Sequence, residues 1–213
     1  MELCRACRMV SPSYIKAVSF GVYEGSMRAA IHALKYNRIS PIARELGKRL
    51  ALAIAGLAGD APDSMLVLPV PLHRGRLAER GFNQAGILAK EALRLLKKSH
   101  PKWKLEFSTD LLVRQRPTES QAGLTPRQRR LNLRAAFFVA DVTAVQGRDI
   151  LLVDDIFTTG ATARACSKTL LNAGAASVRV ATVARAQMRV PLPLDENDGN
   201  LLGGEMAPAT TIH

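Results

Sequence analysis

The sequence has few of the residues on which disulfide-bonded, secreted or membrane-spanning proteins depend. It contains three cysteines among 213 residues, too few for a disulfide scaffold. No apolar run approaches the ~20 residues of a membrane-spanning helix, and the nearest candidate, residues 51–59 (ALAIAGLAG), is short and rich in alanine. The N-terminus lacks the apolar segment of a signal peptide. We therefore expect a cytoplasmic globular protein.

Acidic residues are also in short supply. There are 18 of them against 30 lysines and arginines, which gives a net charge of +12. The basic residues concentrate in two stretches, 74–80 and 114–134. Such stretches can bind a small polyanion through bidentate arginine contacts, attract nucleic acid without sequence preference, or simply form a solvated surface. Composition alone leaves these three alternatives open.

The hydrophobic pattern predicts an α/β fold with a parallel sheet, because apolar runs alternate with helical periodicity. Strands are expected at 17–23, 65–70, 111–113, 135–140, 149–153 and 178–183, and helices at 27–36, 41–54, 82–95 and from about 161 to a C-terminal glycine, Gly174. The basic segments 73–80 and 114–134 are expected to be loops. The second is long for a compact domain, and such loops are often lids over a site.

Residues 151–162 (LLVDDIFTTGAT) carry the main functional signal. An expected buried strand leads to two carboxylates, Asp154 and Asp155, and then to a turn of small residues that begins a helix. Backbone N–H groups and the helix dipole at such a turn bind phosphate, and glycine allows close approach. The carboxylates would repel a phosphate but can accept hydrogen bonds from sugar hydroxyls. The pattern therefore predicts a site for a 5-phosphorylated ribose.

This segment resembles the phosphoribosyl-pyrophosphate (PRPP) motif of type I phosphoribosyltransferases. Three other segments resemble the ComF family, phosphoribosyltransferase-like proteins named for competence in DNA uptake. They are residues 69–85 (PVPLHRGRLAERGFNQA), 116–137 (RPTESQAGLTPRQRRLNLRAAF) and 23–36 (YEGSMRAAIHALKY). All four occur in the order found in the family, and together they extend over roughly residues 4 to 185. The resemblance implies a type I phosphoribosyltransferase fold, with a parallel sheet, flanking helices and a flexible lid loop.

The resemblance also implies roles for individual residues. Asp154 and Asp155 would bind the ribose hydroxyls and support catalysis, with Mg²⁺ as cofactor bridging the sugar and the diphosphate. The 5-phosphate would lie on Thr158, Thr159, Gly160, Ala161 and Thr162, the diphosphate on His73, Arg74, Gly75 and Arg76, and the lid would contain Arg116, Gln121, Arg129 and Asn132. Lys35 and Tyr36 are expected to be packing and surface residues rather than ligands.

The N-terminus departs from the family pattern. Family members usually carry two C-x-x-C pairs that form a zinc ribbon, whereas this sequence has one pair, Cys4 and Cys7, which suits half of a tetrahedral zinc site. Either the start is placed too late or the zinc module has been lost. We expect residues 1–16 to be a remnant of that module, 17–190 the phosphoribosyltransferase-like domain and 191–213 a disordered tail. Cys166 is expected to be a small buried residue of the helix.

Two hypotheses for the function follow. The first is an enzyme that transfers a phosphoribosyl group from PRPP, releases diphosphate and is linked to DNA uptake or competence. The alternative is a non-catalytic protein that senses PRPP or binds single-stranded DNA through its basic loops. No pocket for an acceptor base can be recognised in the sequence. Aromatic residues make up only 5% of the chain, and the basic loops contain Phe82 alone, so DNA binding there would be mainly electrostatic and salt-sensitive.

Overall fold

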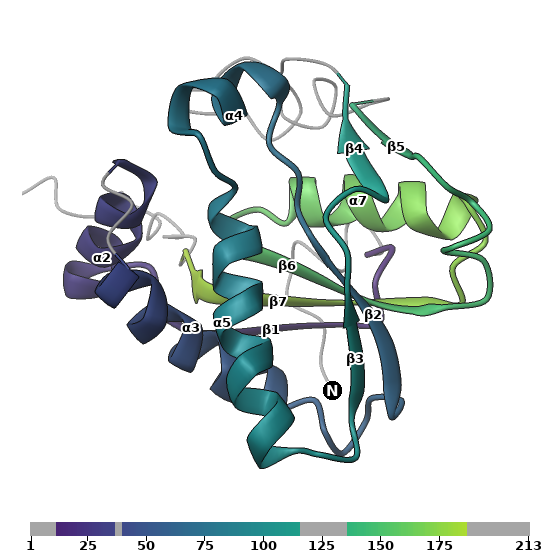
Figure 1. Ribbon diagram of the computed structural model, residues 1–213, viewed down its shortest axis with the longest axis horizontal. Helices are drawn as coiled ribbons and strands as arrows, with labels where there is room; N and C mark the ends of the chain where they lie inside the picture. Colours follow the sequence, from purple (N-terminus) through teal and green to yellow (C-terminus); the bar gives the residue numbers. More distant parts are fainter. Residues whose placement is uncertain (1–11, 37–39, 116–135, 187–213) are drawn as a thin grey trace, which may run out of the picture.

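The computed structural model describes residues 12–36, 40–115 and 136–186. A five-stranded sheet lies at the centre, with the order β1-β7-β6-β2-β3 and parallel pairing throughout (Figure 1). Its strands are β1 (Lys16–Val22), β2 (Ser64–Pro69), β3 (Lys104–Phe107), β6 (Asp149–Phe157) and β7 (Ser177–Arg185). The α/β parallel sheet predicted from the sequence is confirmed.

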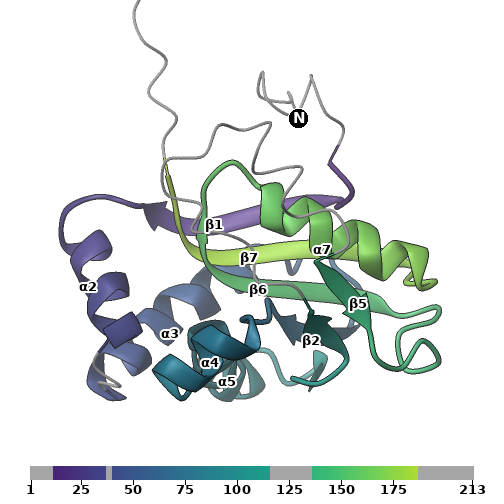
Figure 2. The same cartoon turned by 90° about the horizontal axis from the view of Figure 1, so that it is seen from above.

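Helices cover both faces of this sheet, as the view from above shows (Figure 2). One face carries α7 (Ala161–Asn172), and the other carries α2 (Gly25–Tyr36), α3 (Ser40–Ala55) and α5 (Gln84–Ser99). The short helix α4 (Arg74–Arg80) follows β2. Within the described ranges no helix combines the length and the apolar character needed to cross a bilayer.

Alternate side chains of the central strands pack into two separate cores. In β6, Ile150 and Leu152 join the core beneath α7. Leu151 and Val153 join the core beneath α3 and α5. A strand buried on both faces reads as a continuous apolar run, which is why the sequence pattern located it. The next two positions, Asp154 and Asp155, continue this alternation.

Two further strands form an antiparallel pair outside the main sheet. They are β4 (Leu112–Arg114) and β5 (Phe137–Val139), and Val113 lies opposite Phe138. Phe137 and Leu112 are buried in the core that α7 covers. The pair flanks the segment 116–135, so the expected lid loop connects its two strands but lies outside the described residues.

The structure corrects the sequence predictions at three places. Residues 74–80, predicted to be a loop, form α4, because Leu77, Ala78 and Glu79 favour a helix and Gly81 ends it in the left-handed region with φ of 72°. Strand β6 was predicted to end before the aspartates but continues to Phe157, since it pairs with β7 over nearly its whole length. The edge strand β3 was not predicted at all.

Candidate functional site

The two neighbouring aspartates lie on opposite faces of the sheet. Asp154 follows the alternation of Ile150 and Leu152 and lines a small cleft beside the start of α7. Asp155 follows Leu151 and Val153 toward the face covered by α2, α3 and α5, and its side chain is 8% exposed. This difference in direction follows from the two-residue period of a strand. The two carboxylates therefore have different partners.

Asp155 is held by a lysine from another element. Lys35, in the last turn of α2, places its Nζ 2.7 Å from Oδ2 of Asp155. The contact is an ion pair by distance rather than a well-directed hydrogen bond. A charge this deeply buried is costly without a partner, so Lys35 compensates Asp155 and also ties α2 to the end of β6. The expectation that Lys35 serves only for packing or at the surface is therefore incomplete.

Asp154 forms no ion pair within the described residues, and the charge of Lys35 only partly favours its ionised form. Burial raises the pKa of its carboxyl well above the usual value, and the neighbouring charge of Asp155 raises it further. One stabilising contact comes from the backbone N–H of Asp155, which donates to Oδ1 of Asp154 at 2.8 Å. A carboxylate in such surroundings gains most from a ligand that donates hydrogen bonds or carries positive charge. The hydroxyls of a ribose bound with Mg²⁺ would be ligands of that kind.

The turn after β6 requires glycine at one position. Gly160 has a φ of 69°, and a Cβ added there would lie 2.6 Å from Cζ of Phe157. Gly160 is also the residue before α7, and no side chain caps this helix. The first N–H groups of α7 are thus not satisfied by a capping side chain, which is the arrangement that favours anion binding.

A small cleft lies at this turn. Its volume is about 20 Å³, and its walls include Asp154, Thr158, Gly160 and Thr162. This is room for one water or one group of a ligand, so most of a bound sugar phosphate would lie outside it. Oγ1 of Thr159 is buried without a hydrogen-bond partner in the described parts of the chain. An unpaired buried hydroxyl costs free energy, and a phosphate oxygen could satisfy it.

The predicted diphosphate residues lie at the end of β2, beside β6 in the sheet. His73 caps α4, with its Nδ1 accepting a hydrogen bond of 3.2 Å from the N–H of Gly75. Arg74 and Arg76 are exposed in the first turn of α4. We call residues 73–76 the basic turn and residues 158–162 the phosphate turn. Because β2 and β6 are adjacent and parallel, the two turns project from the same edge of the sheet.

The residues that follow the basic turn hold it in place. Asn83 caps α5 by accepting hydrogen bonds from the N–H groups of Ala85 (3.0 Å) and Gly86 (3.4 Å). Its Nδ2 donates to the carbonyl oxygen of Val70 at 3.0 Å, across the base of the basic turn. The RGFNQ segment thus acts as a brace between β2 and α5.

Arg114 links the basic turn with the acidic strand. Burial lowers the pKa of its guanidinium, nearby Arg76 lowers it further, and Asp154 opposes this shift. Its guanidinium carbon also lies 5.5 Å from the ring centroid of Phe137. Arg76, Arg114 and Asp154 therefore share one electrostatic environment although they come from α4, β4 and β6. Sequence reasoning placed Arg114 only at the start of a basic loop and missed this position.

Cys166 lies in the same region and is free and fully buried, as expected. Burial raises the pKa of its thiol, and the charge of Asp154 raises it further. The predicted lid residues Arg116, Gln121, Arg129 and Asn132, the cysteines Cys4 and Cys7, and the tail lie outside the described residues. The predictions for lid, zinc and tail therefore stay predictions.

Comparison with known proteins places this chain among phosphoribosyltransferase-like proteins. The model of the phosphoribosyl transferase domain matches residues 77–200. DNA utilization protein YhgH of Escherichia coli K12 is 35% identical over 183 residues, which are 83% of this chain and 75% of the relative. Competence protein F of Haemophilus influenzae is 32% identical over 186 residues, 86% of this chain and 78% of the relative. Competence protein ComFC of Bacillus subtilis is 35% identical over 127 residues, 59% of this chain and 47% of the relative.

Proposed function

Because this chain belongs to the ComF family of phosphoribosyltransferase-like proteins, we propose that it binds PRPP with Mg²⁺ at the carboxyl edge of the sheet and transfers the phosphoribosyl group. The main support is that an uncapped helix start and a buried carboxylate with a raised pKa, Asp154, lie at that edge near the charges of Arg76 and Arg114. The names of the relatives, which refer to DNA utilization and competence, support a link to DNA uptake.

Each group has a defined part in binding. The turn from Thr158 to Thr162 would receive the 5-phosphate, with Gly160 allowing its close approach. Asp154 would accept hydrogen bonds from the ribose hydroxyls. Arg76 and Arg114 would attract the diphosphate, which also relieves the mutual repulsion of these two cations. Asp155 would act mainly by fixing the end of β6 through its ion pair with Lys35.

The reaction breaks the bond between C1 of the ribose and an oxygen of the diphosphate. The diphosphate leaves with the electron pair, C1 forms a bond to a nitrogen of an acceptor base, and that nitrogen gives up its proton to the departing diphosphate. Asp154 would stabilise the positive charge that develops on the ribose, and Arg76 would stabilise the departing anion. Mg²⁺, when bound, neutralises diphosphate charge. Each well-placed group of this type can contribute ~3–4 kcal/mol.

A non-catalytic sensor is the second candidate. The cleft beside Asp154 and Gly160 measures about 20 Å³ and provides no room for an acceptor base. If segment 116–135 does not complete such a pocket when PRPP binds, the protein would hold PRPP without consuming it. The two candidates make the same prediction for PRPP binding and differ in turnover.

Calorimetric titration with PRPP tests the binding site. We expect wild-type protein to bind PRPP in the presence of Mg²⁺ and Asp154→Asn to bind at least about tenfold more weakly, because a charge-assisted contact is lost. Asp63→Asn, at an exposed position before β2, is the matched control and should bind as wild type does. Absence of PRPP binding by the wild type would rule out both candidates.

Diphosphate release distinguishes them. Wild-type protein is incubated with PRPP, Mg²⁺ and a panel of purine and pyrimidine bases, and diphosphate is measured. Release that depends on one base and is lost in Asp154→Asn identifies a transferase. Binding of PRPP without base-dependent release identifies the sensor.

A further inference from the structure

A second groove lies far from the candidate PRPP site, between α5 and the edge strand β3. Its volume is about 500 Å³. Its lining includes two aromatic residues, Trp103 and Phe107, and four basic residues: Lys90, Arg94, Lys97 and Lys104. No acidic residue lines the groove. The phosphoribosyltransferase function described above uses none of these residues.

The aromatic side chains are partly exposed and lie close to other flat or charged groups. The Trp103 ring stacks with His100, with centroids 5.3 Å apart and an angle of 27° between the planes. Nζ of Lys90 lies 5.7 Å from the centroid of Phe107. A planar ligand could therefore pack against these rings, and a cation, Lys90, already lies beside Phe107, an arrangement that suits nucleobases attached to phosphates.

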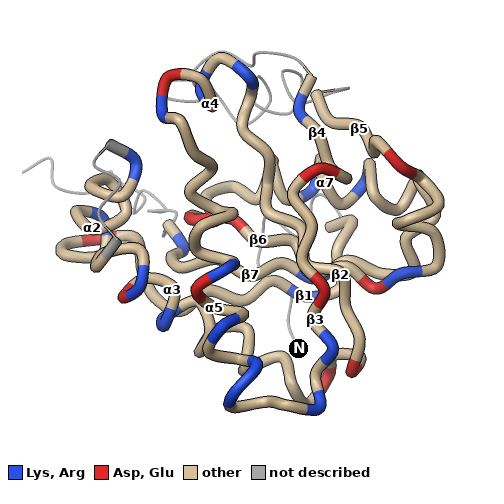
Figure 3. Tube along the Cα trace, in the orientation of Figure 1, with Lys and Arg blue, Asp and Glu red and all other residues tan. Residues whose placement is uncertain are grey.

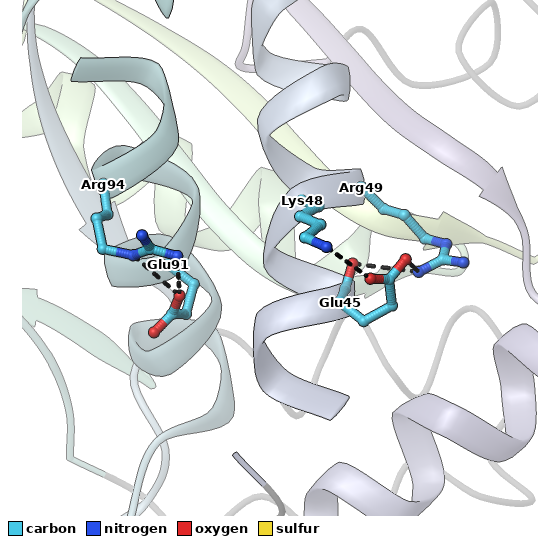
Figure 4. Close-up of polar contacts among 5 residues, drawn as sticks. All are labelled: Glu45, Lys48, Arg49, Glu91 and Arg94. Carbon is cyan, nitrogen blue, oxygen red and sulfur yellow. Dashed lines mark hydrogen bonds and ion pairs between the residues drawn. The ribbon is translucent and has the colours of Figure 1, made fainter. Parts of the chain in front are cut away.

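The basic residues of the groove have few competing carboxylates. Arg94 pairs with Glu91 at 3.2 Å, as Figure 4 shows beside the Glu45 pairs of α3. Lys97 and Lys104, by contrast, form no ion pair within the described residues. Figure 3 shows lysine and arginine positions along the last turns of α5 and at the start of β3. The groove thus presents an excess of positive charge to solvent.

The sheet register places this groove at the amino edge of the sheet. Lys104 begins β3 and lies opposite Ser64, the first residue of β2. Leu66 of β2 in turn lies opposite Ile150, near the start of β6. Asp154 lies toward the other end of β6, so a ligand in the groove would not occupy the phosphate turn or the basic turn. The groove is a separate surface.

We propose that the groove between α5 and β3 binds single-stranded nucleic acid, with bases packing on Trp103 and Phe107 and phosphates contacting Lys97 and Lys104. The combination of rings and unpaired lysines carries the proposal, because stacking and backbone neutralisation are the two components of sequence-independent single-strand binding. A duplex would hide its bases from the rings. An acidic peptide would match the charge but would leave the flat aromatic surface without a matching planar group.

The single tryptophan of the chain is a direct reporter of this surface. We expect an oligo(dT) of about 20 nucleotides to quench Trp103 fluorescence saturably, and the affinity to fall steeply with salt because counterions are released. An oligo(U) of equal length tests whether the sugar matters, and comparable quenching by both supports the proposal. Oligonucleotide binding that leaves Trp103 fluorescence unchanged would place the contact elsewhere and overturn it.

Charge-reversal variants test the basic residues. Lys97→Glu should weaken oligo(dT) binding roughly tenfold and reduce the slope of the salt dependence. Lys168→Glu is the matched control, because Lys168 is exposed on α7, on the opposite face of the sheet. Equal losses in the two variants would indicate a general charge effect and contradict the proposal.

Two further measurements separate the remaining outcomes. Trp103→Phe keeps a ring in the groove and should retain most of the affinity, whereas Trp103→Ala should lose it. PRPP titration of the same variants reports folding and the other site, so loss of oligonucleotide binding with PRPP binding intact is specific to the groove. A poly-Glu peptide that quenches Trp103 while oligo(dT) does not would assign the surface to a protein partner and exclude nucleic acid.

Discussion

At the scale of single residues, two adjacent aspartates with identical chemistry have been given different environments. Asp155 is buried but compensated by Lys35. Asp154 is pushed toward protonation by burial and by Asp155, while the backbone N–H of Asp155 donates a hydrogen bond to it. A ligand that relieves this stress would gain affinity from it. The free protein would carry the cost as lost stability.

Asp154→Asn should therefore stabilise the free protein near neutral pH. The folded-state pKa of Asp154 is raised above the unfolded value of about 3.9. Between these two values the folded state holds a proton that the unfolded state has released, so the free energy of unfolding decreases as pH rises. Asparagine has no such titration. The stability difference should be small near pH 4 and grow with pH, as measured by urea unfolding at several pH values.

The control for this prediction is Asp155→Asn. It removes the partner of Lys35 and should destabilise the protein at neutral pH, because a half-buried ammonium loses its counter-charge. A stability gain in Asp154→Asn that does not change with pH would show that the effect does not come from titration of this carboxyl.

Gly160 offers a second test at this scale. Gly160→Ala should lower the free energy of unfolding by about 1–2 kcal/mol for the left-handed backbone, and by more because its Cβ would meet Phe157 at 2.6 Å. Gly147→Ala is a matched control, because Gly147 has nearly the same φ, 68°, and open space around it. Denaturant unfolding of both variants separates the two contributions. Equal losses would mean that the ring of Phe157 moves aside without cost.

At the scale of elements, the basic turn depends on how α4 and α5 are joined. Gly81 ends α4, and Asn83 then caps α5 while its amide holds Val70 at the end of β2. One side chain thus fixes the positions of two helices relative to the sheet. The arginines of α4 owe their location to it, although Asn83 itself lies in none of the charged contacts.

Asn83→Ala should destabilise the protein by about 1–3 kcal/mol, because a helix cap and the hydrogen bond to Val70 are both lost. PRPP binding should weaken as well, since the basic turn loses its brace. Asn172→Ala, at the exposed end of α7, should change neither quantity appreciably. Thermal unfolding and PRPP titration measure both effects. Unchanged PRPP affinity in a destabilised Asn83→Ala would show that the turn keeps its geometry without the brace.

The elements also show how far the sequence alone could lead. Strands β2, β6 and β7 are buried on both faces, so their apolar runs predicted them. Strand β3 reads Lys-Leu-Glu-Phe and lies at the edge, where short alternating patterns give little signal. Helix α4 was not predicted, because its many charged residues are also typical of a loop. The pairing of Lys35 with Asp155 joins residues 120 positions apart in the chain, and no local pattern contains that information.

The candidate site was predictable where chemistry is local and not where it is tertiary. The turn at Gly160 and the acids before it form one continuous segment, and the sequence located them. To predict that the side chains of Asp154 and Asp155 point to opposite faces, one must know that β6 continues through both residues. To predict the position of Arg114, one must know that β4 lies outside the main sheet and pairs with β5.

At the scale of the whole molecule, one parallel sheet offers two edges with different surfaces. The carboxyl edge carries the proposed PRPP site, and the amino edge carries the groove of Trp103 and Lys97. Asp149 and Asp154 are five positions apart on β6, or roughly 17 Å at strand spacing. At physiological salt this is about two Debye lengths. Two anionic ligands at these edges would repel one another only weakly.

Binding at one edge should therefore be nearly independent of binding at the other. We expect saturating oligo(dT) to change the PRPP dissociation constant by less than about twofold at 0.15 M salt, with more competition at low salt. PRPP titration with and without the oligonucleotide measures this. Strong mutual exclusion at physiological salt would mean that the nucleic acid reaches the carboxyl edge.

The buried thiol beneath α7 can report how often this part of the protein opens. Cys166 is fully buried and its pKa is raised, so an alkylating reagent can modify it only when α7 separates from the sheet. With Cys4 and Cys7 replaced by serine, Cys166 is the single thiol in the chain. Its alkylation rate then reports how often α7 and the phosphate turn open locally in solution. A ligand bound to that turn would lower the alkylation rate of Cys166 in proportion to the fraction of protein that is occupied.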